Sequence, residues 1–371
     1  MDSLEKVTAV VTNQPSVICD MAGLGSGTNV YRQPMSPRWW LRSGHLQTIA
    51  CGLWPVSEEP GDSLREVVEL EDGDRLTVYA NFPAENSPVN PSEIPLTVLL
   101  MPGLCGDHRS GLIRRLTSQL LRAGVSVVRM NHRGCGEQEI LAQRPYHAGR
   151  TSDLLAAIDW WKQSPWAIDV SGRRRKIALC GISLSGNILL KTLGVAAREL
   201  PAEVVAALAI NPPIDLMQCV KQLSVGLNWI YDQFFVRRLY GELARRKDAT
   251  RWPKELRRPQ TLLEFDEFYT APRSGFASAE EYYRLSSARS TLDQIELATT
   301  VLTARDDPLI PVSIFTDGQV RWSPSTRVVV ARSGGHVGYF ETRQGGKSGF
   351  WLDEFVAHWA LRVAGGPVNR L

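Results

Sequence analysis

One serine of the chain stands where it could serve as a nucleophile. Ser183 lies in the segment GISLSG at 181–186, between a short apolar run at 177–180 and a stretch with helical spacing at 187–193. Small residues between a buried strand and a helix allow a sharp turn that lifts a serine hydroxyl above a sheet, and the helix N-terminus directs its partial positive charge at the same point. The segment departs from the G-x-S-x-G pattern because Ser185 replaces the second glycine. Serine is small enough to pack there, so the segment predicts a nucleophile at Ser183.

An acid and a base follow this serine in the order found in hydrolase triads. Asp306 and Asp307 lie in a loop after an apolar run, and His336 lies in a glycine-rich loop after a second apolar run. The order serine, acid, histidine, with acid and base each after a late strand, is that of an α/β-hydrolase triad. The acid usually precedes a short run that ends in proline, as Asp307 does in DPLIP. We therefore expect Ser183, Asp307 and His336 to be catalytic, with Asp306 as the alternative acid.

A further loop offers backbone donors for a negatively charged oxygen. The buried run Leu96–Met101 leads into PGLCG at 102–106. In hydrolases of this kind, that loop and the residue after the nucleophile hold the oxyanion of the tetrahedral intermediate with their backbone N–H groups. We therefore expect an oxyanion hole formed by the amides of Leu104 and Leu184. Because both donors belong to the backbone, the identity of the two side chains matters little.

Apolar runs of strand length alternate with helical segments along most of the chain. Each unit takes roughly 30 residues or more, which is typical of a mainly parallel sheet covered by helices on both faces. Alternating apolar and polar residues on either side of EDGD at 71–74 predict a hairpin before the first parallel strand. The expected fold is α/β, of the α/β-hydrolase type. The expected strands are 65–70, 75–80, 96–101, 125–130, 177–180, 204–210, one that begins at 301 and leads into the loop with Asp306 and Asp307, and 326–331. The clearest helices are 112–123 and 154–161.

Two parts of the chain do not fit this alternation. Residues 1–35 are weakly patterned and are expected to form an irregular N-terminal extension, which leaves residues 36–371 for the hydrolase domain. Residues from about 212 to 296 are rich in aromatic residues, arginine and helical spacing. A long insertion at that edge of the sheet usually lies over the active site, so we expect a helical cap there. Its aromatic side chains should face either the sheet or the cleft above Ser183, where they would form an apolar wall.

Composition and charge limit the functions that the sequence indicates. The 371 residues carry a formal net charge of +3, too small to indicate nucleic acid or an anionic membrane surface as a partner. No run approaches the roughly 18–20 apolar residues of a membrane span, and the acidic N-terminal residues do not match a signal peptide. No cluster has metal-ligand spacing and no glycine-rich phosphate loop is present, so no metal and no cofactor are expected. The six cysteines form no C-x-x-C pair, which favours reduced thiols and a cytoplasmic protein.

Several motifs together resemble the YheT-like branch of the α/β-hydrolases. They extend from about residue 36 to the C-terminal part of the chain: HLQT at 45–48, PGL at 102–104, NHRGCG at 131–136, HAG at 147–149 with Asp153, GISLSGN at 181–187, FDEFYTAP at 265–272, GF at 275–276, YYR at 282–284, DDP at 306–308 and GGHVG at 334–338. The resemblance implies a serine hydrolase that acts on carboxylic esters, with lipid-active relatives in eukaryotes. It implies the same nucleophile, base and pair of candidate acids. The family usually has glycine where this chain has Ser185.

The expected reaction is acyl transfer through a covalent intermediate on Ser183. His336 takes the serine proton, a carboxylate orients His336, and water then releases the acid. The expected partner is a small-molecule ester or lipid with a short or medium acyl chain. A thioesterase, an amidase or an acyltransferase can use the same triad, and a non-catalytic binding protein can keep the same scaffold, so these alternatives stay open.

Overall fold

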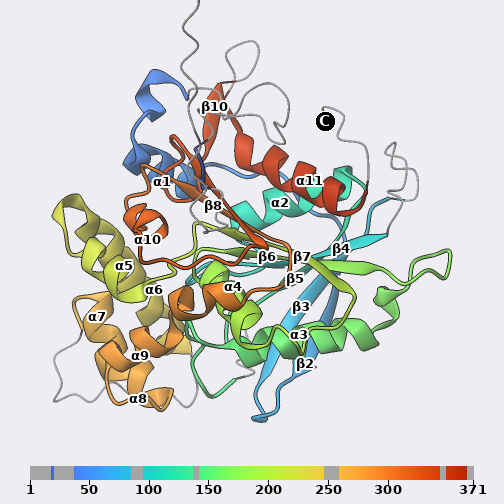
Figure 1. Ribbon diagram of the computed structural model, residues 1–371, viewed down its shortest axis with the longest axis horizontal. Coiled ribbons are helices and arrows are strands. Elements are labelled where there is room, and N and C mark those ends of the chain that lie inside the picture. The colour runs from blue at the N-terminus through green and yellow to red at the C-terminus, as the bar shows by residue number, and fades with distance from the viewer. Residues whose placement is uncertain are drawn as a thin grey trace, which may run out of the picture.

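A sheet of nine strands runs through the centre of the protein (Figure 1). The computed structural model describes residues 18–20, 37–84, 95–136, 142–245, 259–342 and 348–365, and the nine strands lie within these ranges. Their order across the sheet is β1-β9-β8-β7-β6-β4-β5-β3-β2. The strands are β1 Ile18–Asp20, β2 Leu64–Glu69, β3 Arg75–Asn81, β4 Leu96–Met101, β5 Ser126–Met130, β6 Lys176–Ile182, β7 Val204–Ile210, β8 Thr299–Ala304 and β9 Thr326–Ala331.

Seven neighbouring strands pair in parallel, and these are β1, β9, β8, β7, β6, β4 and β5. The last two strands, β3 and β2, form a hairpin in which β3 pairs antiparallel with β5. The parallel strands are continuous apolar runs because helices exclude water from both of their faces. All six residues of β4 are buried, for example. The predicted α/β fold, with a mainly parallel sheet and an N-terminal hairpin, is confirmed.

Helices cover both faces of the sheet and divide the interior into two apolar cores (Figure 1). One core packs Ile158 of α3 and Leu189 of α4 against the sheet. The other packs Leu116 of α2 and Phe355 of α11 against the opposite face. The covering helices are α2 Gly111–Arg122, α3 Thr151–Gln163, α4 Leu184–Val195 and α11 Trp351–Val363.

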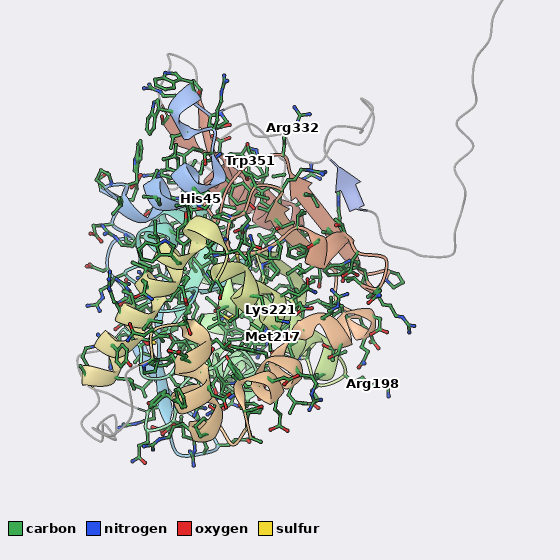
Figure 2. The ribbon with its side chains drawn as sticks, turned by 90° about the vertical axis from the view of Figure 1, so that its left-hand side faces the viewer. His45, Arg198, Met217, Lys221, Arg332 and Trp351 are labelled. Carbon is green, nitrogen blue, oxygen red and sulfur yellow. The ribbon has the colours of Figure 1, made fainter. Side chains whose placement is uncertain are left out.

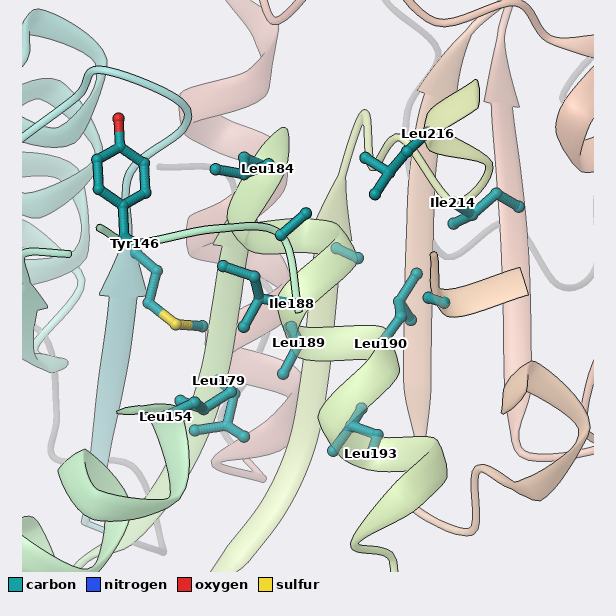
Figure 3. Close-up of a cluster of buried hydrophobic side chains, with 14 of the residues drawn as sticks. Tyr146, Leu154, Leu179, Leu184, Ile188, Leu189, Leu190, Leu193, Ile214 and Leu216 are labelled. Carbon is teal, nitrogen blue, oxygen red and sulfur yellow. The ribbon is translucent and has the colours of Figure 1, made fainter. Parts of the chain in front are cut away.

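Helix α4 is buried on nearly all sides (Figure 3). Leu189, Leu190 and Leu193 have no exposed surface. In Figure 3, Leu154 of α3 lies on one side of α4 and Leu216 lies on the other. A helix that is apolar all round is typical of a position inside the core. Because α4 begins directly after Ser183, this packing holds that residue in a fixed place above the sheet.

Strand β1 forms one edge of the sheet. Ile18, Cys19 and Asp20 pair in parallel with Val328, Val329 and Val330 of β9. The expectation of an irregular extension over residues 1–35 is therefore wrong for these three residues. A three-residue strand is too short to show a periodic pattern, so only its pairing with β9 reveals it. The other residues of the extension lie outside the described ranges.

Between β7 and β8 the chain forms a group of helices at one side of the sheet (Figure 1). These are α5 Leu216–Leu223, α6 Trp229–Arg245, α7 Leu262–Phe265, a π-helix Asp266–Thr270, α8 Ala271–Arg273, α9 Ala279–Ser286 and a 3-10 helix Ala288–Gln294. Tyr231, Tyr282 and Tyr283 are buried among them. Trp229, Phe234 and Phe268 are exposed, so these three rings are not buried against the sheet. The role of the group as a cap stays a prediction.

Helix α1 (Gly44–Leu53) packs on the segment that follows β9. The side chain of Gln47 accepts a hydrogen bond from the backbone N–H of Phe340, at 3.0 Å. Phe340 begins the small hairpin β10 Phe340–Thr342 and β11 Ser348–Phe350. Throughout the described ranges, no helix is both long and apolar enough to cross a membrane.

Candidate active site

Ser183 occupies a strained turn between β6 and α4. Its backbone has φ +51° and ψ −116°, in a region that residues with a side chain rarely adopt. The turn is tight on both sides. A Cβ atom on Gly181 would lie 2.4 Å from the carbonyl oxygen of Ser185, and one on Gly186 would lie 2.9 Å from Cβ of Pro212. The two glycines therefore allow the close approach that the turn needs.

A chain of two hydrogen bonds links Ser183 to a carboxylate. His336 Nε2 lies 2.9 Å from Ser183 Oγ, and His336 Nδ1 lies 2.9 Å from Asp307 Oδ2. His336 and Asp307 are both buried, so neither water nor salt screens their contact strongly. The structure thus brings together the three residues that the sequence singles out as nucleophile, acid and base.

Asp307 also accepts hydrogen bonds that hold its carboxylate in place. Its Oδ1 accepts from the backbone N–H groups of Leu309 and Ile310, at 2.8 and 3.1 Å. Its Oδ2 accepts from Asn211 Nδ2, at 2.7 Å. These hydrogen bonds fix the orientation of the Asp307 carboxylate that faces His336.

Asp306 has a different position. Its Oδ1 accepts from the backbone N–H groups of Gly334 and Gly335, at 2.8 and 2.9 Å. These contacts connect the loop after β8 to the glycine-rich loop that carries His336. Burial raises the pKa of the Asp306 carboxyl above its usual value. Of the two candidate acids, the structure therefore places Asp307 against His336 and Asp306 against the backbone of the His336 loop.

The loop after β4 lies directly beside Ser183. A Cβ atom on Gly103 would lie 3.2 Å from Ser183 Cβ and 3.8 Å from Ser183 Oγ. Within the described ranges, neither the Leu104 amide nor the Leu184 amide donates a hydrogen bond to another protein group. Both predicted oxyanion donors are thus available. Cys105 has φ +58°, and its amide donates to the hydroxyl of Tyr146, at 3.1 Å, which fixes the turn after Leu104.

Ser185 connects this loop to the nucleophile helix. Its buried hydroxyl donates to the carbonyl oxygen of Pro102 and lies 3.0 Å from His132 Nε2. His132 in turn stacks on Tyr146, with 4.9 Å between ring centroids. Burial lowers the pKa of His132, so its ring stays neutral. The residue that departs from the G-x-S-x-G pattern thus has a polar contact which glycine could not make.

Two further residues hold the site, and the sequence analysis assigned them no role. Thr48 of α1 accepts from the backbone N–H of His336, at 2.8 Å, and donates to Gly44 O, at 2.7 Å. Asn211, whose φ is +46°, holds Asp307 and accepts from the hydroxyl of Tyr339, at 2.8 Å. Thr48 ends the HLQT motif, which was the only sequence signal for it. Asn211 stands between β7 and two prolines, a position that indicates a turn but no contact with the acid.

The described residues give no sign of a metal centre. No group of three or more His, Cys, Asp or Glu side chains within them is arranged to hold a metal ion. The described cysteines Cys51, Cys105, Cys135, Cys180 and Cys219 form no disulfide bond. Burial raises the pKa of the Cys219 thiol, which keeps it protonated and unreactive.

Comparisons with known proteins identify the family of the chain. A family model described as serine aminopeptidase S33 matches residues 93–315, more than half of the chain. The sequence is 25% identical to the protein named "Putative esterase YheT" of Escherichia coli, over 96% of this chain and 97% of that one. It is 24% identical to phospholipase ABHD3 of Mus musculus, over 82% of this chain and 73% of that one. The structure resembles that of 2,6-dihydroxy-pseudo-oxynicotine hydrolase, with a TM-score of 0.51, 17% identity and coverage of 88% and 74%.

Proposed function

The chain belongs to the serine aminopeptidase S33 family of α/β-hydrolases, and from this premise we propose that it hydrolyses carboxylic esters through an acyl-enzyme on Ser183. The observation that carries the proposal is the continuous contact from Asp307 through His336 to Ser183, with 2.9 Å at each step. A hydroxyl next to an imidazole, which is itself held by a buried carboxylate, is the arrangement that activates serine as a nucleophile.

The first half of the reaction forms the acyl-enzyme. Ser183 Oγ attacks the ester carbonyl carbon while its proton passes to His336 Nε2. Asp307 stabilises the imidazolium that results. His336 then gives this proton to the departing alkoxide oxygen, the bond to the alcohol breaks, and the alcohol leaves.

The second half of the reaction releases the acid. His336 takes a proton from water, the resulting hydroxide attacks the acyl carbon, and the proton returns to Ser183 Oγ as the carboxylic acid leaves. In both halves the negative charge that develops on the carbonyl oxygen is stabilised by the amides of Leu104 and Leu184. One such donor is worth roughly 2.7–4 kcal/mol in hydrolases where it has been removed.

The substrate class is inferred from the relatives as well as from the site. One relative is named a putative esterase and another a phospholipase, and both names refer to the hydrolysis of ester bonds. The same residues could cleave thioesters or amides, because the triad fixes the chemistry at the carbonyl and not the leaving group. We assign the chain to short- and medium-chain acyl esters or ester lipids.

A matched set of substrates tests this assignment. Esters, thioesters and amides with the same acyl group should be compared by kcat/KM, over a series of acyl lengths. We expect the esters to be turned over fastest, and turnover to be lost in Ser183→Ala. Faster cleavage of the matched thioester or amide, or turnover that survives in Ser183→Ala, would overturn the assignment.

A further inference from the structure

Helix α1 presents an apolar face to solvent. Leu46, Ile49 and Leu53 follow one another at intervals of three and four residues, so they share one face of the helix. All three are exposed, and Leu53 reaches 78%. The opposite face contains Gln47, which is fully buried. Trp39, in the turn before α1, is 80% exposed and adds a large aromatic ring to this end of the molecule.

The start of α6 presents a second apolar face. Ile230 and Phe234 are one helical turn apart and both are exposed, together with Trp229. Leu227, in the turn before α6, is 66% exposed. The opposite side of α6 buries Val236 against the core.

The two faces lie next to each other. The ring of His45, on α1, stacks on that of Tyr231, on α6, with 5.8 Å between centroids and 3.1 Å between His45 Nδ1 and the Tyr231 hydroxyl. Figure 2 shows His45 where α1 meets the helices of the insertion. We call the exposed apolar side chains on both helices and their preceding turns the α1–α6 surface. Its members are Trp39, Trp40, Leu46, Ile49, Leu53, Leu227, Trp229, Ile230 and Phe234.

The helices that carry this surface also touch the catalytic loops. On one side, Thr48 of α1 holds the backbone of His336. On the other side, Arg238 of α6 donates to the carbonyl oxygen of Cys105, at 3.2 Å, in the loop that carries Leu104. The two helices that carry the α1–α6 surface therefore contact the site on the His336 side and on the oxyanion side.

The exposed charged side chains in the two segments that carry the surface are positive. Residues 37–57 contain no aspartate or glutamate, and residues 216–241 contain only Asp232, which is buried. The same two segments contain five cations, which are Arg38, Arg42, Lys221, Arg237 and Arg238. The net charge of +3 is small for the whole chain, but here the positive charge is concentrated around apolar and aromatic side chains.

We propose that the α1–α6 surface docks the protein on an anionic lipid surface. Exposed tryptophan and aliphatic side chains gathered in one place enter the boundary between headgroups and acyl chains. Arginine and lysine at the rim of such a patch are attracted by anionic headgroups. A protein partner would not need positive charge alone around the apolar side chains, whereas an anionic lipid surface attracts it. A lipid surface therefore fits the observations best.

Vesicle binding tests the proposal without depending on the proposed function. The full-length Ser183→Ala protein should be sedimented with vesicles of pure phosphatidylcholine and with mixed phosphatidylcholine–phosphatidylglycerol vesicles. We expect binding to the mixed vesicles, weaker binding to the pure ones, and a decrease with added salt. No binding to either kind of vesicle would overturn the proposal, whatever the substrate assays show.

A pair of variants locates the contact. Leu53→Glu with Leu227→Glu should reduce binding to mixed vesicles by about tenfold or more, because both residues lie in the α1–α6 surface. The matched control is Val170→Glu, which changes an apolar residue that is 99% exposed. Val170 lies in the turn before β6, whereas Ser183 follows the other end of that strand. This control should bind as before. Equal losses in both proteins would overturn the proposal.

Two further measurements keep the test decisive. Thermal unfolding should show that the Leu53→Glu, Leu227→Glu double variant folds. If that protein does not fold, the variant with Arg42→Glu and Arg237→Glu takes its place, and it should lose the preference for anionic vesicles. Analytical ultracentrifugation should find the same oligomeric state for the double variant and the control. If the double variant instead dissolves an oligomer and leaves vesicle binding intact, the surface is a protein interface and the proposal is wrong.

Discussion

Ser185 shows how one residue can couple the nucleophile to the oxyanion loop. In the G-x-S-x-G pattern this position is glycine, which has no side chain that could bond to the loop after β4. Here the Ser185 hydroxyl donates to the Pro102 carbonyl oxygen, two residues before the Leu104 amide. The contact therefore ties together the two segments that provide Leu104 and Leu184.

Removing this hydroxyl should affect turnover more than substrate binding. We expect Ser185→Ala and Ser185→Gly each to lower kcat by about tenfold with little change in KM, since the oxyanion donors act mainly in the transition state. The lost hydrogen bond should also lower the free energy of unfolding by about 0.5–1.5 kcal/mol, because the Pro102 carbonyl oxygen still lies 3.1 Å from His132 Nε2. Steady-state kinetics and urea unfolding measure the two effects. Unchanged kcat in both variants would show that the contact serves stability alone.

The two neighbouring aspartates should respond differently to the same substitution. Asp307→Asn should lower kcat by about 10⁴-fold, as in a triad whose histidine is left in the wrong tautomer. Asp306→Asn should cost far less, because its Oδ1 can still accept from Gly334 and Gly335. Measuring kcat of both variants on one ester shows which aspartate is the catalytic acid. A larger loss in Asp306→Asn would mean that the acid has been assigned wrongly.

At the residue scale, the sequence was informative where local spacing carries the signal. Ser183 and His336 each stand in a glycine-rich turn after an apolar run, and such turns can be read from neighbouring residues. Thr48 and Asn211 could not be assigned in this way, because Thr48 meets His336 across 288 residues and Asn211 meets Asp307 across 96. Contacts of that range depend on the tertiary structure.

Among the elements, the junction between the insertion and the sheet contains a histidine that is buried without a counter-charge. His147, in the loop before α3, packs edge-on against Phe276 and Tyr282 of the insertion. Its Nδ1 accepts from the amide of Gly149, at 3.1 Å, so the ring is neutral. Burial, with the nearby charge of Arg150, lowers the pKa of His147 to about 3.

This histidine should make the stability of the protein fall with decreasing pH. In the unfolded chain its pKa is about 6.5, so between about pH 6.5 and 3 the unfolded state binds the proton that the folded state does not. The stabilisation is complete above about pH 6.5 and decreases by about 1.4 kcal/mol for each pH unit below it.

The matched variant is His147→Asn, whose side-chain oxygen can accept the same hydrogen bond and cannot titrate. Urea unfolding of both proteins should be measured at several pH values. The free energy of unfolding of the wild type minus that of His147→Asn should decrease from pH 7 to pH 4, because only the wild type loses stability. Parallel curves for the two proteins would contradict a neutral, buried His147.

The bounds of the most buried strands and helices could be predicted best from the sequence. Strands β4 and β7 are apolar runs because both faces are covered, and the predicted ranges 96–101 and 204–210 agree with the observed bounds. The helices of the insertion were expected only as a group, since their residues mix aromatic and charged types. Which aromatic rings face solvent, as Trp229 and Phe234 do, depends on how these helices pack and not on their own sequence.

On the scale of the whole molecule, a buried arginine connects parts of the fold that are far apart in sequence. Arg133, in the loop after β5, donates to Asp153 at the start of α3 and to Asp74 at the start of β3, at 2.8 and 2.9 Å. A third carboxylate, that of Asp72, lies 2.7 Å from the guanidinium. These carboxylates raise the pKa of Arg133 above its usual value, against the effect of burial. The cluster fixes the hairpin against the first helix on that face of the sheet.

Breaking the cluster should destabilise the whole domain. We expect Arg133→Met to lower the free energy of unfolding by about 3–5 kcal/mol, because it leaves buried carboxylates without their counter-charge. The matched control is Arg144→Met, since Arg144 is half exposed and pairs with Asp72 at 3.2 Å; it should cost about 0–1 kcal/mol. Denaturant unfolding of both variants measures the contrast. Similar losses would show that burial does not decide the strength of these ion pairs.

The central claim is that Ser183 is a nucleophile activated by His336, and covalent labelling tests it most directly. The purified protein should be treated with a fluorophosphonate, and the modified residue should be located by mass spectrometry of its peptides. We predict one phosphonyl group, carried by the peptide that contains Ser183, and none on the Ser183→Ala protein. Labelling of another residue, or a wild-type protein that takes up no label, would contradict the claim.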